Sequence, residues 1–324
     1  MLPSFSFDEL DIISDRRPIR KLYGFVTGDP GAFEFGVEIV GSTALFIRIE
    51  KQTRDVPGGY QGYRRTFEEN YTKIARAALG STSHHRIIRY DFGGLQCLVR
   101  SAVDAFIRSA EELLSPDLDP VTDSGDLVSY MKATSLGAQA PSLDMQPTAP
   151  GVSVVKGGIV VPRKCCLELK TRSKFAKYPW DIEQKLPDLW ISQTQTFVVA
   201  SHQHWGTKWA SPRLAIFSSK DIRVKSMHGE LFAWERKNAA ALEKLRHVLS
   251  EVIQAAKEIN APCIVGFDGD KKTLLVRKVE KGTMLGLSND LRKKWSAGGD
   301  GLTVDPITAK DDVHVPCAEK GINK

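Results

Sequence analysis

The stretch Leu167-Glu-Leu-Lys-Thr-Arg-Ser173 carries the pattern on which the assignment of the fold depends. Together with the apolar residues before it, this stretch predicts a β-strand. Successive side chains of a strand point to opposite faces, so Glu168 and Lys170 share one face and Leu167 and Leu169 share the other. A carboxylate beside an ammonium group can form a catalytic centre. It can also be an ion pair on a solvated strand face, and so short a motif leaves both interpretations open.

Two polar residues elsewhere in the chain favour a centre over a solvated face. Asp104 lies near the end of the apolar run from 96 to 106, where packing gives no reason for a carboxylate. Gln193 belongs to the amide-rich segment Ser192-Gln-Thr-Gln-Thr196, which we place on the helix after the Glu168 strand, although exposed helix amides are an alternative. We therefore predict a catalytic site formed by Asp104, Glu168, Lys170 and Gln193.

This arrangement resembles the active centre of the PD-(D/E)XK nucleases. In that superfamily an Asp and a Glu on adjacent strands hold Mg²⁺, which activates water and neutralises the phosphate, while the Lys orients the nucleophile. The resemblance implies a mixed α/β fold, with a nuclease-like mixed sheet flanked by helices. It also implies that Asp104 and Glu168 are the metal ligands if the chain is a nuclease.

A more specific resemblance is to the decapping exoribonucleases, which carry G-Y-x-F-E, G-E-V-D, E-L-K-T and a Gln-bearing helix in this order. The counterparts here are Gly62-Tyr63 with Phe67-Glu68, Ala102-Val103-Asp104, Glu168-Leu169-Lys170-Thr171, and Gln193. The first segment is spaced differently. Ala102 stands where that family has a glutamate ligand, so the charge available to hold metal ions is reduced.

A third resemblance covers more of the chain. The segments 37–41, 46–48, 83–100, 167–173 and 186–190 look like a fungal family whose members are often mislabelled geranylgeranyl pyrophosphate synthases. Those synthases need two D-D-x-x-D clusters, and the nearest approach here is Asp311-Asp312-Val-His, so that label fails. We identify the family with the fungal arginine-containing cyclodipeptide synthases. The function expected from this resemblance is the synthesis of cyclo-Arg-Xaa diketopiperazines by aminoacyl transfer, without a cofactor or a metal.

This third resemblance implies a role for each site residue. Asp104 and Glu168 would bind the arginyl guanidinium or the α-amine, and Lys170 would assist proton transfer or stabilise an oxyanion. Two histidines, His84 and His85, are possible acid-base groups. Trp180 or Tyr178 would stack on the terminal adenine of the tRNA. Its phosphates would be held by Arg86, Arg89, Arg172, Lys174 and Lys177.

The expected partners are therefore aminoacyl-tRNAs, including Arg-tRNA, with no membrane and no obligate protein partner. The alternative function is a Mg²⁺- or Mn²⁺-dependent PD-(D/E)XK-type RNA nuclease or decapping hydrolase. A nuclease-fold RNA-binding protein that has lost catalysis is the third possibility.

The bulk composition is compatible with each of these functions. The 324 residues carry a formal charge of +6, a weak signal for a polyanionic partner. The five cysteines lack zinc-ligand spacing, and Cys97, Cys165 and Cys166 are expected to be core residues. No run of about 18 apolar residues and no signal peptide is present, so we expect a cytoplasmic protein.

The organisation expected along the chain is a single nuclease-like domain over 1–324. We expect a mobile insertion over 115–151, rich in Pro, Asp, Ser and Gly, and a frayed tail over 297–324. Hairpins are predicted over 35–50, 86–106 and 261–279, and two further strands over 152–170. Helices are predicted over 66–79 and 236–259, and helical spacing is found over 180–202.

Overall fold

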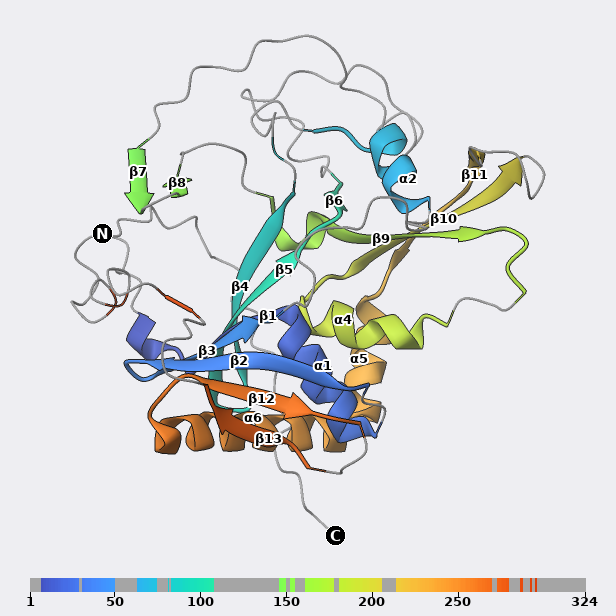
Figure 1. The fold of residues 1–324 in the computed structure, drawn as a ribbon. Helices are drawn as coiled ribbons and strands as arrows, with labels where there is room; N and C mark the ends of the chain where they lie inside the picture. The colour runs from blue at the N-terminus through green and yellow to red at the C-terminus, as the bar shows by residue number, and fades with distance from the viewer. Residues whose placement is uncertain are drawn as a thin grey trace.

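The structure is a computed structural model of the chain. It describes residues 7–28, 31–49, 63–74, 81, 83–107, 146–149, 152–154, 161–177, 181–205, 214–269, 273–279, 286–287, 292 and 295. These residues form a mixed α/β fold in which helices flank two mixed sheets, as the sequence predicts (Figure 1). The expected insertion over 115–151 lies outside the described residues except for 146–149, and the expected tail over 297–324 lies wholly outside them.

The larger sheet has seven strands in the order β13-β12-β2-β3-β1-β5-β4. Strand β1 runs parallel to both of its neighbours, β3 and β5, and the remaining pairs are antiparallel. The three predicted hairpins are confirmed as β2 with β3, β4 with β5, and β12 with β13. The strands span Ile12–Asp15 (β1), Phe33–Val40 (β2), Thr43–Arg48 (β3), His85–Phe92 (β4), Leu95–Ala102 (β5), Cys263–Phe267 (β12) and Leu275–Lys278 (β13).

Helices α1 (Arg16–Thr27) and α6 (Ala239–Ile259) cover one face of this sheet (Figure 1). The predicted helix over 236–259 is confirmed as α6, preceded by α5 (His228–Lys237), and its stripe from Leu242 to Ala256 is buried. Such a stripe at three- and four-residue spacing stabilises a helix mainly through packing. Helix α1 is not predicted above, although Ile19, Leu22 and Tyr23 follow the same rule and are buried.

The smaller sheet has four strands in the order β11-β10-β9-β6, and it carries the motif that decided the fold. Strands β9 and β10 are parallel, and the other two pairs are antiparallel. Leu167, Leu169 and Val198 pack with Phe67 of α2 (Arg64–Tyr71) on one face. The strands span Ala105–Phe106 (β6), Cys166–Ser173 (β9), Thr196–Trp205 (β10) and Leu214–Ser226 (β11).

The structure corrects three of the sequence-based boundaries. The helix expected over 66–79 is α2, which ends at Tyr71. Of the helical segment expected over 180–202, the described residues 181–202 are helical in η5 (Glu183–Lys185) and α4 (Leu186–Ile191). From Thr196 the chain pairs with β9 as strand β10, because this run is rich in β-branched and aromatic residues. The strand expected over 96–106 is interrupted at 103–104, where the chain leaves the larger sheet for the smaller one. Asp104 lies in this crossing.

Between 152 and 170, β8 (Val152–Val154) and η4 (Arg163–Cys165) precede β9. Strand β8 pairs with β7 (Gln146–Ala149), and η1 (Phe7–Glu9) precedes β1. Within the described ranges, no helix combines the length and apolar content that a bilayer crossing requires.

Candidate active site

Two buried carboxylates meet where the chain passes between the sheets. Strand β6 pairs antiparallel with β9 through Ala105 and Leu167, which places Asp104 beside Glu168 on the neighbouring strand. The Asp104 Oδ2 atom accepts a hydrogen bond of 2.7 Å from the backbone N–H of Leu169. The Asp104 and Glu168 side chains are only 6% and 8% exposed. The alternation predicted for β9 therefore turns Glu168 away from the leucine core and toward Asp104.

Lys170 belongs to the same centre, as its sequence spacing predicts. It donates a hydrogen bond to Glu168 Oε1, and its Nζ lies 3.9 Å from Asp104 Oδ2. Its side chain is 16% exposed. One ammonium group thus faces both carboxylates, and the simple alternative of a solvated strand face does not describe this site.

Two arginines that the sequence analysis does not single out complete the centre. Arg16, the first residue of α1, lies 3.4 Å through Nη1 from Glu168 Oε2. Arg64, the first residue of α2, forms an ion pair through Nη2 with Asp104 Oδ1, and through Nε it lies 2.6 Å from Glu68 Oε1. Arg64 lies inside the segment that resembles the first exoribonuclease motif, so this resemblance could have identified it as a candidate site residue. Arg16 depends on a helix that was not predicted.

The two carboxylates differ in acidity. Burial and the charge of Glu168 raise the pKa of Asp104 to about 6, against the lowering effects of Arg64 and of the Leu169 N–H. Burial also acts to raise the pKa of Glu168, but the charges of Lys170 and Arg16 outweigh it, and the pKa of Glu168 falls below its ordinary value. Adjacent acids with separated pKa values are typical of functional sites, although ion-pair networks can also produce them.

The donors of this centre suit one hard divalent cation. Within the described part of the chain, no cluster of three or more His, Cys, Asp or Glu side chains could hold a metal ion. Mg²⁺, however, is usually bound through one or two carboxylates, with water and substrate phosphate completing its shell. Asp104 and Glu168 supply two such carboxylates side by side. The exposed Ala102 adds none at the end of β5, so the pair fits a single ion.

Among the described residues, the hydrogen bonds that Gln193 donates go to Trp190 and not to the carboxylates. It follows α4 in the left-handed conformation, at φ 52°, and its backbone N–H bonds to Trp190 O at 3.0 Å. The next N–H, of Thr194, bonds to Leu189 O at 2.9 Å, which completes a Schellman motif at the end of the helix. The Gln193 side chain donates to the same Trp190 carbonyl at 2.7 Å.

The basic residues predicted to hold tRNA phosphates lie on β4 of the larger sheet and on or just after β9 of the smaller sheet. Arg86 donates to Val161 O at 2.7 Å, and Arg89 lies 3.1 Å from Glu9 Oε2. Lys174 forms an ion pair with Asp221, and Lys177 is exposed beyond β9. Arg172 shares the strand face of Lys170 by alternation. Tyr178 and Trp180 lie outside the described residues.

The remaining candidates are exposed or lie in the core. His84 and His85 are exposed at the start of β4, where His85 pairs with Ala102. Cys97, Cys165, Cys166 and Cys263 are buried, and Cys317 lies outside the described residues. Burial raises the pKa of Cys97 to about 12, against nucleophilic use.

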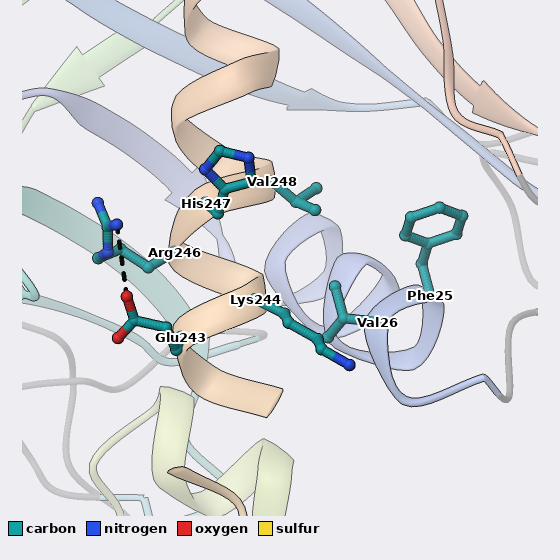
Figure 2. Close-up of a pocket in the computed structure, with 7 residues that line it drawn as sticks. All are labelled: Phe25, Val26, Glu243, Lys244, Arg246, His247 and Val248. Carbon is teal, nitrogen blue, oxygen red and sulfur yellow. Dashed lines mark ion pairs between the residues drawn. The ribbon is translucent and has the colours of Figure 1, made fainter. Parts of the chain in front are cut away.

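An open hollow of about 500 Å³ lies on the helical layer, between Phe25 and Val26 of α1 and residues 243–248 of α6 (Figure 2). Figure 2 shows the Arg246 and Glu243 side chains paired at its edge. It contains none of the predicted site residues, so the carboxylate centre is the candidate active site.

The two mixed sheets and their flanking helices form a PD-(D/E)XK-like fold. The chain belongs to the family described as "Domain of unknown function (DUF8563)", whose sequence model matches residues 1–284. No protein with a curated description matches the sequence.

Solved structures share the fold at low sequence identity. Candida albicans Rai1 in complex with pU5-Mn²⁺ is similar with a TM-score of 0.52 and 11% identity, over 89% of this chain and 75% of that chain. Scheffersomyces stipitis Rai1 is similar with a TM-score of 0.50 and 14% identity, over 89% and 74%. These matches confirm the nuclease-like core.

The same matches correct two functional expectations. The assignment as an aminoacyl-tRNA-dependent cyclodipeptide synthase is wrong, because the similar structures are Rai1 proteins and none of the comparisons supports a synthase family. The expectation of no cofactor is also wrong, because a similar structure holds Mn²⁺ with pU5. The segments that suggested a synthase include parts of strands β2, β4, β5 and β9, and such short stretches did not identify a substrate.

Proposed function

We propose that the chain is a divalent-metal-dependent hydrolase that cleaves phosphodiester bonds of RNA. The observation that carries this proposal is the pair Asp104 and Glu168, placed side by side on neighbouring strands and sharing Lys170. Support also comes from the Mn²⁺ and pU5 bound by a Rai1 protein of the same fold.

Asp104 and Glu168 would hold one Mg²⁺ or Mn²⁺. When bound, such an ion polarises a phosphoryl oxygen and lowers the pKa of water, which generates a nucleophile near neutral pH. Lys170 would orient the attacking water through its ammonium hydrogen atoms, since it already reaches both carboxylates. Arg16 and Arg64, at the first turns of α1 and α2, would place guanidinium groups against the substrate phosphate, which they can bind bidentately.

RNA shortening under metal control tests the proposal. Purified protein is incubated with 5′-phosphorylated oligouridine, with either MnCl₂ or EDTA, and the products are resolved by length. We expect Mn²⁺-dependent shortening, reduced by on the order of 100-fold or more in Glu168→Gln, because several kcal/mol of transition-state stabilisation depend on the ion. The matched control is Glu230→Gln on α5, whose carboxylate pairs with Lys225 at 2.6 Å.

Cleavage that persists in EDTA or in the Glu168 variant would contradict the proposal. Metal-independent binding of the oligonucleotide without any shortening would instead favour an RNA-binding protein on a nuclease fold. Ala102 is the residue that keeps this second function in consideration, since it supplies no carboxylate beside Asp104.

A further inference from the structure

Every carboxylate oxygen of the candidate metal site already faces a donor of the protein. Asp104 gives Oδ1 to Arg64 and Oδ2 to the N–H of Leu169. Glu168 gives Oε1 to Lys170 and Oε2 to Arg16. Each oxygen keeps a second lone pair, but the three cations beside the pair repel a divalent ion, so its binding is favoured when one of these cations moves away.

The donors differ in how readily they can leave. The Leu169 N–H is fixed in the backbone of β9, and Lys170 is a largely buried side chain of the same strand. Arg64 is the most exposed of the three cations, at 39%, and it begins a helix that has no side-chain cap at its first turn. A half-exposed guanidinium on a helix end can change rotamer at small cost, so Arg64 is the donor to move.

Glu68 gives Arg64 a second partner. It lies one helical turn along α2, and its Oε1 is 2.6 Å from Arg64 Nε, so the guanidinium bridges Glu68 and Asp104. If Arg64 releases Asp104, it keeps an ion pair with Glu68 and its charge does not become unpaired. The cost of leaving is reduced accordingly.

We propose that Arg64 is a built-in counter-ion that competes with the divalent metal for Asp104, and that Glu68 holds Arg64 when the metal binds. The inference rests on the proposed metal-dependent function. Two buried carboxylates side by side need positive charge nearby, and Arg64 supplies it in the metal-free protein. Metal binding then requires that the ion pair between Arg64 and Asp104 be broken. The apparent affinity of the protein for the metal is lowered by the free energy of this ion pair.

The experiment measures Mn²⁺ affinity by titration calorimetry on protein freed of metal with a chelator. We expect Arg64→Met to bind Mn²⁺ about tenfold more tightly than the unmodified chain, which corresponds to one lost competing ion pair. Arg64→Lys keeps the charge but cannot bridge two carboxylates, so its gain should be smaller. Lys225→Met removes a cation from a surface pair on β11 and is the matched control, with unchanged affinity. Thermal unfolding of each variant confirms that it is folded.

A double variant separates the role of Glu68 from direct metal ligation. Glu68→Gln should weaken Mn²⁺ binding severalfold, because Arg64 then has only Asp104 as a partner. In the Arg64→Met background the same change should have no effect if Glu68 acts through Arg64 alone. A loss of affinity in that background would make Glu68 a ligand and overturn its assigned role.

The possible failures are distinguishable. If the unmodified chain binds Mn²⁺ in a Glu168-dependent way and Arg64→Met binds it equally or more weakly, competition by Arg64 is overturned while the metal-dependent function stands. If neither the unmodified chain nor Arg64→Met binds Mn²⁺, both the competition and the proposed metal-dependent function are overturned.

Discussion

Two buried glutamates of this fold, Glu38 and Glu168, are held in opposite ways. Glu38 lies on β2 and is 2% exposed, and its Oε1 pairs with Arg292. Its Oε2 has no hydrogen-bond partner among the described residues, and a Cβ on Gly286 would collide with this carboxylate. Glu168 has a donor at each oxygen and shares its charge network with a second carboxylate, Asp104.

The difference separates a structural ion pair from a site that can exchange ligands. The Glu38 carboxylate pairs with Arg292 and lies against residue 286, where an added Cβ would collide with it. At Glu168, three cationic side chains surround the carboxylates of Glu168 and Asp104. One of these cations, Arg64, is 39% exposed and also pairs with Glu68. Burial alone therefore does not mark the candidate site. What marks it is a carboxylate pair with a replaceable counter-ion.

Removal of one arginine from each site gives the largest expected difference in stability. Arg292→Met should lower the free energy of unfolding by about 3 kcal/mol or more, because it leaves the buried Glu38 charge unpaired. Arg64→Met should cost about 1 kcal/mol or less, because its side chain is partly solvated and Lys170 and Arg16 remain. Urea unfolding of both variants at pH 7 measures the two costs.

The Glu38→Gln and Arg292→Met double variant is the control for this comparison. With the buried charge gone, most of the stability lost in Arg292→Met should return. An equal cost for the two arginine variants would show that the carboxylate centre is as tightly clamped as the Glu38 pair.

The dependence of stability on pH tests the inequality between the two carboxylates of the centre. The pKa of Asp104 is raised from 3.8 to about 6, so the folded state binds its proton more tightly than the unfolded state does. This proton contributes stability below pH 3.8, and the contribution is lost as pH rises through 6. The loss is roughly 2 to 3 kcal/mol by linkage. Glu168 acts in the opposite sense, because its pKa is lowered and its stabilisation is lost as pH falls.

Asp104→Asn isolates the Asp104 contribution. The unfolding free energy of the unmodified chain, minus that of the variant, should fall between pH 4 and pH 7 when both are measured by urea unfolding in EDTA. A difference that rises over this range would mean that Arg64 and Lys170 outweigh burial at Asp104.

Local sequence patterns predict much of the fold, but they predict only some of the residues that form the candidate site. The stripe of α6 and the three hairpins obey spacing rules that depend on few residues, and they were predicted correctly. Glu168 and Lys170 were placed on one face because strand alternation is a local rule. The nearness of Asp104 to Glu168 was inferred from a resemblance, since the pairing of β6 with β9 joins residues more than 60 positions apart.

The arginines of the centre show what local pattern cannot supply. Arg16 reaches Glu168 across 152 positions, and only the tertiary packing of α1 against α4 and the sheets brings them together. The functional resemblance to a synthase failed for a related reason. It rested on short segments, several of them strands, and a strand sequence reports pairing and packing but carries little information about the substrate.

Gln193 provides the last and smallest test of how far the carboxylate centre extends. In the left-handed conformation a non-glycine residue costs roughly 1 kcal/mol, which Gln193→Gly would recover. The same change removes the side-chain hydrogen bond to Trp190 O at 2.7 Å, worth about 1 kcal/mol. We therefore expect a change in unfolding free energy within about 0.5 kcal/mol and no change in RNA shortening. If the rate of RNA shortening falls at least tenfold while stability is unchanged, the Gln193 amide must leave the Trp190 carbonyl and contact the substrate. Gln193 would then belong to the catalytic site, as the sequence predicts.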